Sequence, residues 1–133
     1  MSRAEQGTVE QGTGPGVRPP VVVVFGGPSA EHDVSVVSGT AIAAALAARG
    51  HPVRQLYVDL AARWWRLPAD HRRGELAPAA YDEPAALGAK GPFGAGDATA
   101  SIAAERPQPV VFVALHGPYG EDGTVQLGRA AWR

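Results

Sequence analysis

Two short stretches of the 133-residue sequence combine side chains that can bind or polarise a small molecule. The first, GGPSAEHD, runs from residue 26 to 33 and joins two glycines to a serine, two carboxylates and an imidazole. The second, HGPYGEDG, runs from residue 116 to 123 and joins an imidazole to three glycines and two adjacent carboxylates. A carboxylate can hold an ammonium group, an imidazole can exchange a proton, and glycine lets the backbone approach a ligand closely. These stretches are therefore the candidate functional loops.

Both loops follow apolar runs that are predicted to be buried strands. The runs are 21–25 (VVVVF) and 110–115 (VVFVAL), and continuous runs of this kind are typical of strands covered on both faces of a parallel sheet. A helix is expected between them, with Ser29 as its N-cap. It should end near Arg49, because Gly50 is a natural residue for the turn after a helix.

The remaining elements suggest an α/β, Rossmann-like parallel sheet with flanking helices. Residues 53–58 (VRQLYV) are predicted to form a second strand, which makes a strand–helix–strand unit of the parallel, right-handed kind. If the strand at 21–25 lies between the other two, both loops flank one crevice at the carboxyl ends of the strands. A short strand is expected at 63–67. The stretch 68–109 reads as irregular, with a weak helical signal at 98–105, and a helix is expected to begin at Thr124.

Composition excludes several classes of protein. The 12 basic and 13 acidic side chains give a net charge of −1, so no basic surface is expected to collect nucleic acid. Without cysteine, a disulfide scaffold, a zinc–thiolate site and thiol catalysis are excluded. No apolar run approaches the roughly 20 residues of a membrane span, and no signal peptide is visible. These features predict a cytoplasmic protein with one domain after a flexible tail at residues 1–18.

Each loop also has a simpler structural interpretation. Residues 26–29 can bind an anion at a helix N-terminus or can merely form a tight turn, since they match no nucleotide-binding motif. His116 is equally compatible with a ligand contact and with a structural histidine. Trp64 and Trp65 are expected to pack in the core or at a sheet edge and not to stack on a ligand.

Two acidic or histidine-containing pairs are weak metal candidates. His32 and Asp33 lack a third ligand at useful spacing. Glu121 and Asp122 can hold a divalent ion, but acidic residues before a helix are more commonly caps. A Ser–His–Asp hydrolase is not supported, because no G-x-S-x-G motif is present.

The two loops lie within longer motifs that resemble one known family. Residues 22–39, VVVFGGPSAEHDVSVVSG, closely resemble the opening motif of D-alanine–D-alanine ligases. Residues 110–126, VVFVALHGPYGEDGTVQ, resemble the second N-terminal motif of the same family, in the same order. The resemblance implies that residues 19–133 correspond to the N-terminal, pre-ATP-grasp domain of such a ligase.

The resemblance also implies a reaction. Ligases of this family use ATP to phosphorylate the carboxylate of one D-alanine, and the amine of a second D-alanine attacks the acyl phosphate, giving the dipeptide for peptidoglycan. Mg²⁺ offsets the phosphate charge. In the family ATP is bound by the later ATP-grasp regions, so neither ATP nor Mg²⁺ is expected to bind this chain, and residues 26–29 are assigned no nucleotide contact. A homodimer is implied for the complete enzyme.

Five residues of this sequence match family positions that contact the first D-alanine. Glu31 would hold its ammonium group, and His116 would lie close to its reacting carboxyl group. These two are the residues expected to take part in catalysis. Val34 would line the subsite near the methyl group. Gly26 and Gly27 would shape the loop so that backbone can approach the substrate.

The resemblance stops after Gln126, where the sequence continues LGRAAWR. The chain therefore looks like the first third of an enzyme with its ATP-grasp domain absent. We expect it to be inactive alone and to self-associate through an exposed strand at 110–115. The DNA after codon 126 would distinguish a frameshift or premature stop from a shortened chain. A D-alanine-binding module without catalysis, and a protein that docks on a full-length ligase, are the alternative functions. The second substrate, D-alanine, D-lactate or D-serine, is left open.

Overall fold

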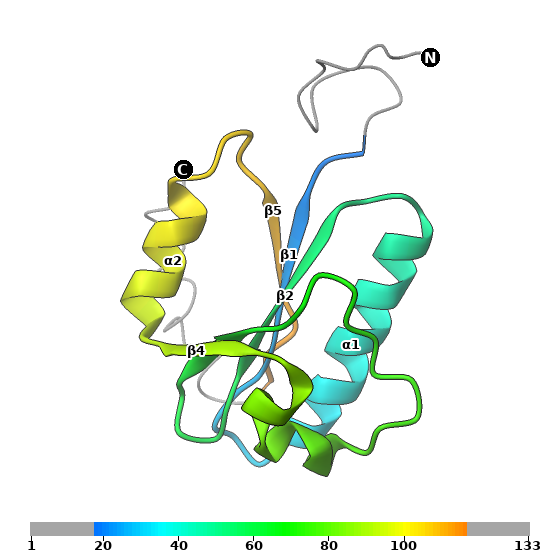
Figure 1. The fold of residues 1–133 in the computed structure, drawn as a ribbon, viewed down its shortest axis with the longest axis vertical. Coiled ribbons are helices and arrows are strands. Elements are labelled where there is room, and N and C mark those ends of the chain that lie inside the picture. Colours follow the sequence, from blue (N-terminus) through cyan, green and yellow to red (C-terminus); the bar gives the residue numbers. More distant parts are fainter. Residues whose placement is uncertain (1–17, 117–133) are drawn as a thin grey trace.

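The fold is seen in a computed structural model, which describes residues 18–116 (Figure 1). Most of the predicted tail (1–17), the rest of the second loop with Glu121 and Asp122, and the helix expected from Thr124 lie outside the described residues. The described part contains one five-stranded sheet with strand order β4-β3-β2-β1-β5. The strands are β1 (Val21–Gly26), β2 (Val53–Val58), β3 (Trp64–Arg66), β4 (Lys90–Phe93) and β5 (Val110–Val113).

The three predicted strands form the parallel centre of this sheet. β1 lies between β2 and β5, with Val21 opposite both Val53 and Val110. The predicted condition for a shared crevice is therefore met, because the loops after β1 and β5 leave the same end of the sheet. The sheet as a whole is mixed, since β3 and β4 are antiparallel additions to this parallel centre. β3 follows β2 after a short turn, and a connection that short can join only antiparallel strands.

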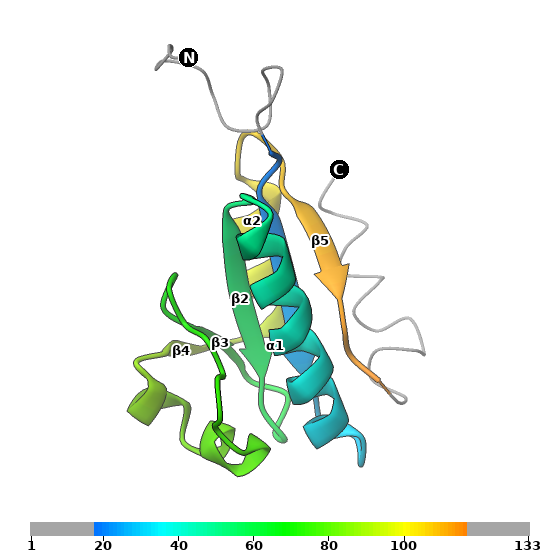
Figure 2. The same cartoon turned by 90° about the vertical axis from the view of Figure 1, so that its right-hand side faces the viewer.

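One helix covers each face of the sheet (Figure 2). Helix α1 (His32–Ala48) lies on one face and α2 (Ala95–Ala103) on the other. The end of α1 was predicted correctly: Arg49 is its C-cap, and Gly50 follows with φ +90°. Its start was not, because Glu31 is the N-cap and Ser29 stands outside the helix. Neither helix of the described part has the length and apolar character needed to cross a membrane.

The face covered by α1 holds the aromatic core. The rings of Phe25, Tyr57 and Tyr81 lie within 6.1 Å of one another, centre to centre. Tyr81 belongs to the 3-10 helix η1 (Pro78–Asp82), which with a second one, η2 (Pro84–Leu87), closes this face beside α1. Gly39 makes the close packing possible, because a Cβ atom there would lie 2.3 Å from the Cβ of Phe25. The irregular stretch after residue 67 is thus part of the core.

The face covered by α2 is packed more sparsely. The sheet presents large side chains here, including the fully buried Trp64, which confirms its predicted packing role. From α2, however, only Ala98 and Ile102 enter this core as buried hydrophobic residues. The helix begins three residues before the predicted 98–105 segment and ends two residues before it does. Its small side chains leave little to fill the space against the sheet.

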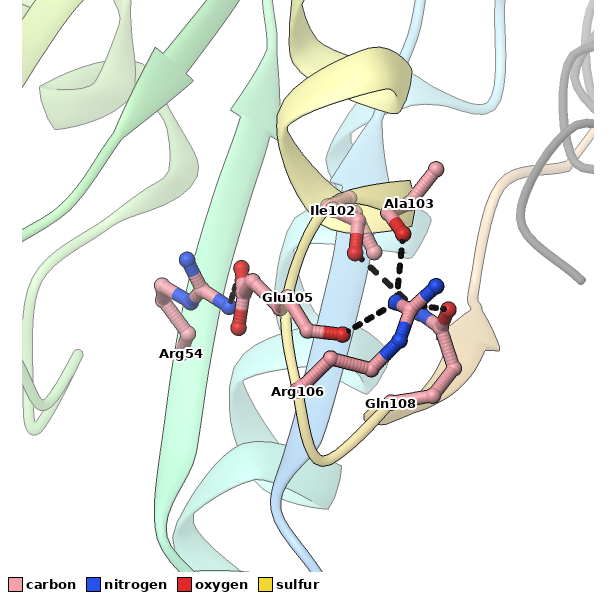
Figure 3. A network of polar contacts seen from close by, with 6 residues as sticks. All are labelled: Arg54, Ile102, Ala103, Glu105, Arg106 and Gln108. Carbon is pink, nitrogen blue, oxygen red and sulfur yellow. Dashed lines mark hydrogen bonds and ion pairs between the residues drawn. The ribbon is translucent and has the colours of Figure 1, made fainter.

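A polar network holds the end of α2 (Figure 3). The Arg106 guanidinium donates to the Ala103 carbonyl (2.8 Å), and the Gln108 amide donates to the Ile102 carbonyl (3.1 Å). These bonds satisfy carbonyls that a helix end leaves without partners. Glu105, which follows the helix, forms an ion pair with Arg54 of β2. The last turn of α2 is therefore fastened to the sheet by polar contacts.

Strand β5 departs from its prediction. It was expected to be buried on both faces over 110–115, but it ends at Val113, and Val110 and Phe112 are 54% and 44% exposed. These two side chains lie on the α1 face, at a sheet edge that α1 does not reach among the described residues. Ala114 and Leu115, beyond the strand, are buried against the core. Apolar sequence thus does not by itself guarantee burial when no neighbour covers the strand.

Candidate functional site

The first candidate loop begins with a turn that only glycine can form. Gly26 and Gly27 have φ values of +102° and +95°, a region that other residues rarely adopt. A Cβ atom on Gly26 would also lie 2.2 Å from the Val58 carbonyl oxygen. That oxygen accepts the Gly27 N–H at 2.7 Å. The turn therefore lies tightly against the end of β2, and α1 begins directly behind it.

Ser35 joins the turn to the end of β5. Its hydroxyl donates to the Ala114 carbonyl at 2.6 Å and accepts the Gly26 N–H at 2.8 Å. The side chain is fully buried, so it has no competing water. The glycine turn, the first turns of α1 and the segment after β5 meet at this one oxygen atom, which fixes the distance between the two candidate loops.

Ser29 provides the second connection between the loops, and it involves both predicted catalytic residues. Its hydroxyl accepts the Glu31 N–H at 3.1 Å and donates to the His116 carbonyl at 2.9 Å. The backbones of Glu31 and His116 are thus held on either side of a single serine oxygen. Because this hydroxyl bonds within the loop, it does not cap the first turn of α1, which is why the predicted N-cap was wrong.

The three predicted side chains differ in exposure. Glu31 is exposed, and its carboxylate makes no hydrogen bond within residues 18–116. Val34 is 57% exposed and lies one helical turn after Glu31, on the same side of α1. His116 is half-buried and is the last described residue; its ring has no hydrogen-bond partner in that part of the chain. An unpaired carboxylate, an unpaired imidazole and an exposed apolar side chain are therefore available at one end of the sheet.

His32 has a structural role. Its Nδ1 lies 2.6 Å from the Gly27 carbonyl oxygen, which can only accept, so Nδ1 carries a proton. Its Nε2 lies 2.9 Å from the hydroxyl of Tyr57, and in the neutral ring Nε2 accepts the phenolic proton. The ring is 4% exposed. Both nitrogens are thus used to hold the glycine turn, and neither is directed at a ligand.

The Tyr57 hydroxyl stays protonated at any ordinary pH. Burial raises the pKa of Tyr57 far above its usual value, and the nearby carboxylates of Asp59 and Asp82 raise the pKa further. The Tyr57 hydroxyl therefore keeps the proton that it can donate to Nε2 of His32. Tyr57 in turn packs against Tyr81, whose hydroxyl lies 2.6 Å from Nε2 of His71.

Asp59, at the carboxyl end of β2, is fully engaged in the next turn. It accepts hydrogen bonds from the Ala61 and Arg63 backbone, from the Arg63 guanidinium and from the Trp65 indole, all between 2.9 and 3.0 Å. Burial opposes the charge on Asp59, but these donors outweigh it and lower the pKa of the carboxyl group. The sequence predicted Trp65 correctly as a packing residue at the sheet, and its partner Asp59 shapes the β2–β3 turn.

The residues that support the site from behind were not predicted from the sequence. Ser35 lies one turn after Glu31, and a small polar residue on the inner side of a helix was the available signal. Tyr57 gave no signal, because an aromatic residue in a strand is ordinary core. Nor is a metal site visible: within residues 18–116, no group of three or more His, Asp or Glu side chains is arranged to hold a metal ion. The second acidic pair lies outside the described residues.

Comparison with known proteins places this geometry in a family. The family model for the D-ala D-ala ligase N-terminus matches residues 20–128. The chain belongs to this family.

Individual relatives agree with this assignment. The chain is 40% identical over 109 residues to a D-alanine–D-alanine ligase of Methylobacterium sp. (strain 4-46), and the match covers 80% of this chain and 28% of the relative. It is 37% identical to D-alanine–D-alanine ligase A of Mesorhizobium japonicum, covering 80% and 30%. The chain therefore spans about 30% of the length of these curated ligases.

A solved structure has the same fold. The VanG D-Ala:D-Ser ligase from Enterococcus faecalis matches with a TM-score of 0.65 and 22% identity, over 86% of this chain and 34% of that one. At this identity the match shows the α/β fold of the ligase N-terminal domain, including its mixed sheet. The fold and family predicted from the two motifs are thus confirmed.

Proposed function

We propose that this domain holds the first D-alanine of a D-alanine–D-alanine ligase reaction, which joins two D-alanines with ATP hydrolysis for peptidoglycan synthesis in the cytoplasm. The observation that supports it most directly is the Ser29 hydroxyl, which bonds to the backbones of both Glu31 and His116. The two motifs that carry the family resemblance are thereby brought to one place, at the carboxyl ends of β1 and β5, where α/β sheets bind ligands.

Each group has a role that follows from its chemistry. The Glu31 carboxylate, which has no partner in the described part, would pair with the ammonium group of D-alanine. The His116 imidazole would donate to the carboxylate that is activated. Val34 would contact the methyl group, and the Gly26–Gly27 turn would leave room for the substrate against the backbone. The site holds and orients one amino acid, which is the positioning part of a two-substrate reaction.

The described residues do not fit ATP with Mg²⁺. Residues 18–116 offer neither a cluster of metal-binding side chains nor a phosphate-binding glycine loop with lysine. We place both cofactors in the part of the complete enzyme that the relatives have and this match does not cover. We accordingly expect the 133-residue chain alone to release no phosphate above background from ATP, Mg²⁺ and D-alanine.

Binding of D-alanine to the chain tests the proposal. Isothermal calorimetry should detect D-alanine but not D-lactate, which has the same carboxylate and methyl group without the ammonium group. The Glu31→Gln variant should lose most of the D-alanine signal. Glu75→Gln is the matched control, because Glu75 is an exposed carboxylate far along the chain with no hydrogen-bond partner in the described part. Equal binding of D-alanine and D-lactate would contradict the proposal.

Self-association is a second proposed property, and the exposed edge of β5 favours it. Val110 and Phe112 present apolar surface on β5, which is the edge strand of the sheet that residues 18–116 form, and an edge strand is a template for another strand. Light scattering should show oligomers that Phe112→Lys reduces. Leu60→Lys, at an equally exposed apolar residue of the β2–β3 turn, should leave them unchanged. A monomer at millimolar concentration would contradict this proposal, and the interaction-module alternative would lose its support.

A further inference from the structure

A second candidate site lies under α2, on the face of the sheet opposite α1. A hollow of about 260 Å³ lies beside this helix, and residues of α2 and of strands β2, β3 and β4 line it. Its apolar wall comes from Leu56, Phe93, Ala98 and Ile102, with Phe93 40% exposed at its side. The volume lies just below the usual range of small-molecule sites, about 300–1,000 Å³, and the lining has the same mixture of apolar and few charged groups.

The hollow exists because α2 is built from small residues. Its sequence, AGDATASIA, offers one large apolar side chain, Ile102, toward a sheet that presents Leu56 and Trp64. The Arg54–Glu105 ion pair and the capping bonds of Arg106 hold the last turn in place (Figure 3). The last turn of α2 is therefore held against the sheet, and the hollow continues along the earlier turns at Asp97, Ala98 and Ser101.

A second hollow, of about 370 Å³, adjoins the first and shares Arg54 and Arg66 with it. Lys90 lines its other end, and Arg66 and Lys90 stand opposite each other in the β3–β4 register. Arg54 is neutralised by Glu105. Neither Arg66 nor Lys90 has an ion-pair or hydrogen-bond partner within residues 18–116. No acidic residue lines this second hollow.

We propose that the two adjoining hollows form one trough and that this trough binds a small organic anion. Its charged head, a carboxylate or a phosphate monoester, lies between Arg66 and Lys90, and its compact apolar portion lies under α2 against Leu56, Phe93 and Ile102. Arg66 lines both hollows and Lys90 lines the second, and neither cation has a partner among residues 18–116. An amphiphilic anion therefore matches these cations and the apolar wall of the first hollow. Asp97, on the helix side of the first hollow, disfavours a second negative charge at the apolar end.

The trough is separate from the proposed D-alanine site. Its residues belong to α2, to strands β2, β3 and β4 and to the segments directly after β3 and before β4, whereas Ser29 and Glu31 belong to the β1–α1 connection and Val34 to the first turn of α1. The two sites share no residue. The inference therefore does not depend on the ligase proposal, and either can fail without the other.

Chemical-shift titration of the ¹⁵N-labelled full chain tests the proposal with four defined probes. Phenyl phosphate and phenylacetate differ in the head, inorganic phosphate lacks the apolar portion, and benzyl alcohol lacks the charge. We expect the two aryl anions to shift the amides of Phe93, Ala98 and Ile102 with saturation, and the other two probes to bind at least about tenfold more weakly. The stronger of the two aryl anions identifies the head group.

Variants separate the trough from general charge effects. Arg66→Gln should weaken the aryl anion about fivefold to tenfold, the loss expected for one charge-assisted contact. Arg49→Gln is the control, since Arg49 is an exposed arginine on the other side of the molecule without a side-chain partner in the described part. Arg66 is exposed on its strand, so its replacement should not prevent folding.

Three results would overturn the proposal. They are equal affinities of Arg66→Gln and the unchanged chain, shifts from inorganic phosphate as large as those from the aryl anions, or no saturation of any probe. Ala98→Leu gives an independent check, because it fills the hollow. It should abolish aryl binding while the amide spectrum outside α2 stays the same, and retained binding would also contradict the proposed site.

Discussion

The two faces of the sheet are packed to different densities by the helices that cover them. On the α1 face, three aromatic rings and the 3-10 segment fill the space, and glycine lets the helix approach the sheet. On the α2 face, an alanine-rich helix lies over the sheet and leaves a hollow. Interiors are normally packed as densely as organic crystals, so an unfilled space under a helix is unusual. The densely packed α1 face thus holds the glycine turn in place, whereas the sparsely packed α2 face leaves room for a ligand.

The largest effect is expected in the dense core. Phe25→Ala should lower the free energy of unfolding by about 3–5 kcal/mol, because the ring contacts both Tyr57 and Tyr81 and little can move to fill the cavity. Urea denaturation measures it. For comparison, Ile102→Ala on the α2 face should cost about 2 kcal/mol, since part of its surroundings is already empty. Equal losses would contradict the proposed difference between the faces.

Enlarging one buried alanine on each face should change the free energy of unfolding by different amounts. Ala43→Leu, at a buried position of α1, overpacks the dense face and should cost about 1–3 kcal/mol. Ala98→Leu extends into the hollow and should change stability by less than about 0.5 kcal/mol or raise it. Thermal unfolding of both variants compares them directly. If Ala98→Leu were as destabilising as Ala43→Leu, the hollow would be too small to accept a side chain.

Removing one hydroxyl tests the connection between the dense face and the proposed D-alanine site. Tyr57→Phe leaves the buried Nε2 of His32 without its donor and should cost about 1–3 kcal/mol. Because His32 holds the Gly27 carbonyl, D-alanine binding should weaken as well. Tyr81→Phe removes a similar hydroxyl bond, to His71, but should leave D-alanine binding unchanged. Equal effects of both variants on binding would show that His32 does not position the loop.

The smallest expected effect is a pH dependence from His71 beside the dense core. Burial and then the neighbouring Arg72 lower the pKa of His71, so between its folded value and the unfolded value of about 6.5 the unfolded chain binds more protons. Stability from this residue is complete above about pH 6.5 and falls as the pH decreases toward the folded pKa. Urea midpoints at pH 7.5 and 5.5 should differ less in His71→Gln, and an unchanged difference would exclude His71 as the cause.

Several elements were predictable from local sequence because local physics decides them. Residues 21–25 are an apolar run, and residues 53–58 are rich in residues that favour strands; both are strands at the predicted positions. Gly50 ends α1 as predicted, since a left-handed residue after a helix is a local requirement. The two loops were expected to flank one crevice if the strand at 21–25 lay between the other two, and the observed strand order meets that condition.

Other features could not be predicted from local sequence, because residues that are distant along the chain decide them. The start of α1 moved to His32 because Ser29 bonds to His116, which is 87 residues away. Val110 and Phe112 are exposed because no element of the described part covers them, although their run reads like a buried strand. The 3-10 segment around Tyr81 reads as irregular sequence and yet closes the core.

The sequence by itself determined the family, the parallel centre of the sheet and the residues proposed for D-alanine. Each of these follows from the types of the residues and from their spacing along the chain. Only the tertiary structure decided that His32 holds a turn, that Ser29 and Ser35 join the two loops, and that Arg66 lines a hollow beside α2. The reason is physical: burial, hydrogen-bond partners and empty volume are properties of the surroundings, and distant parts of the chain provide those surroundings.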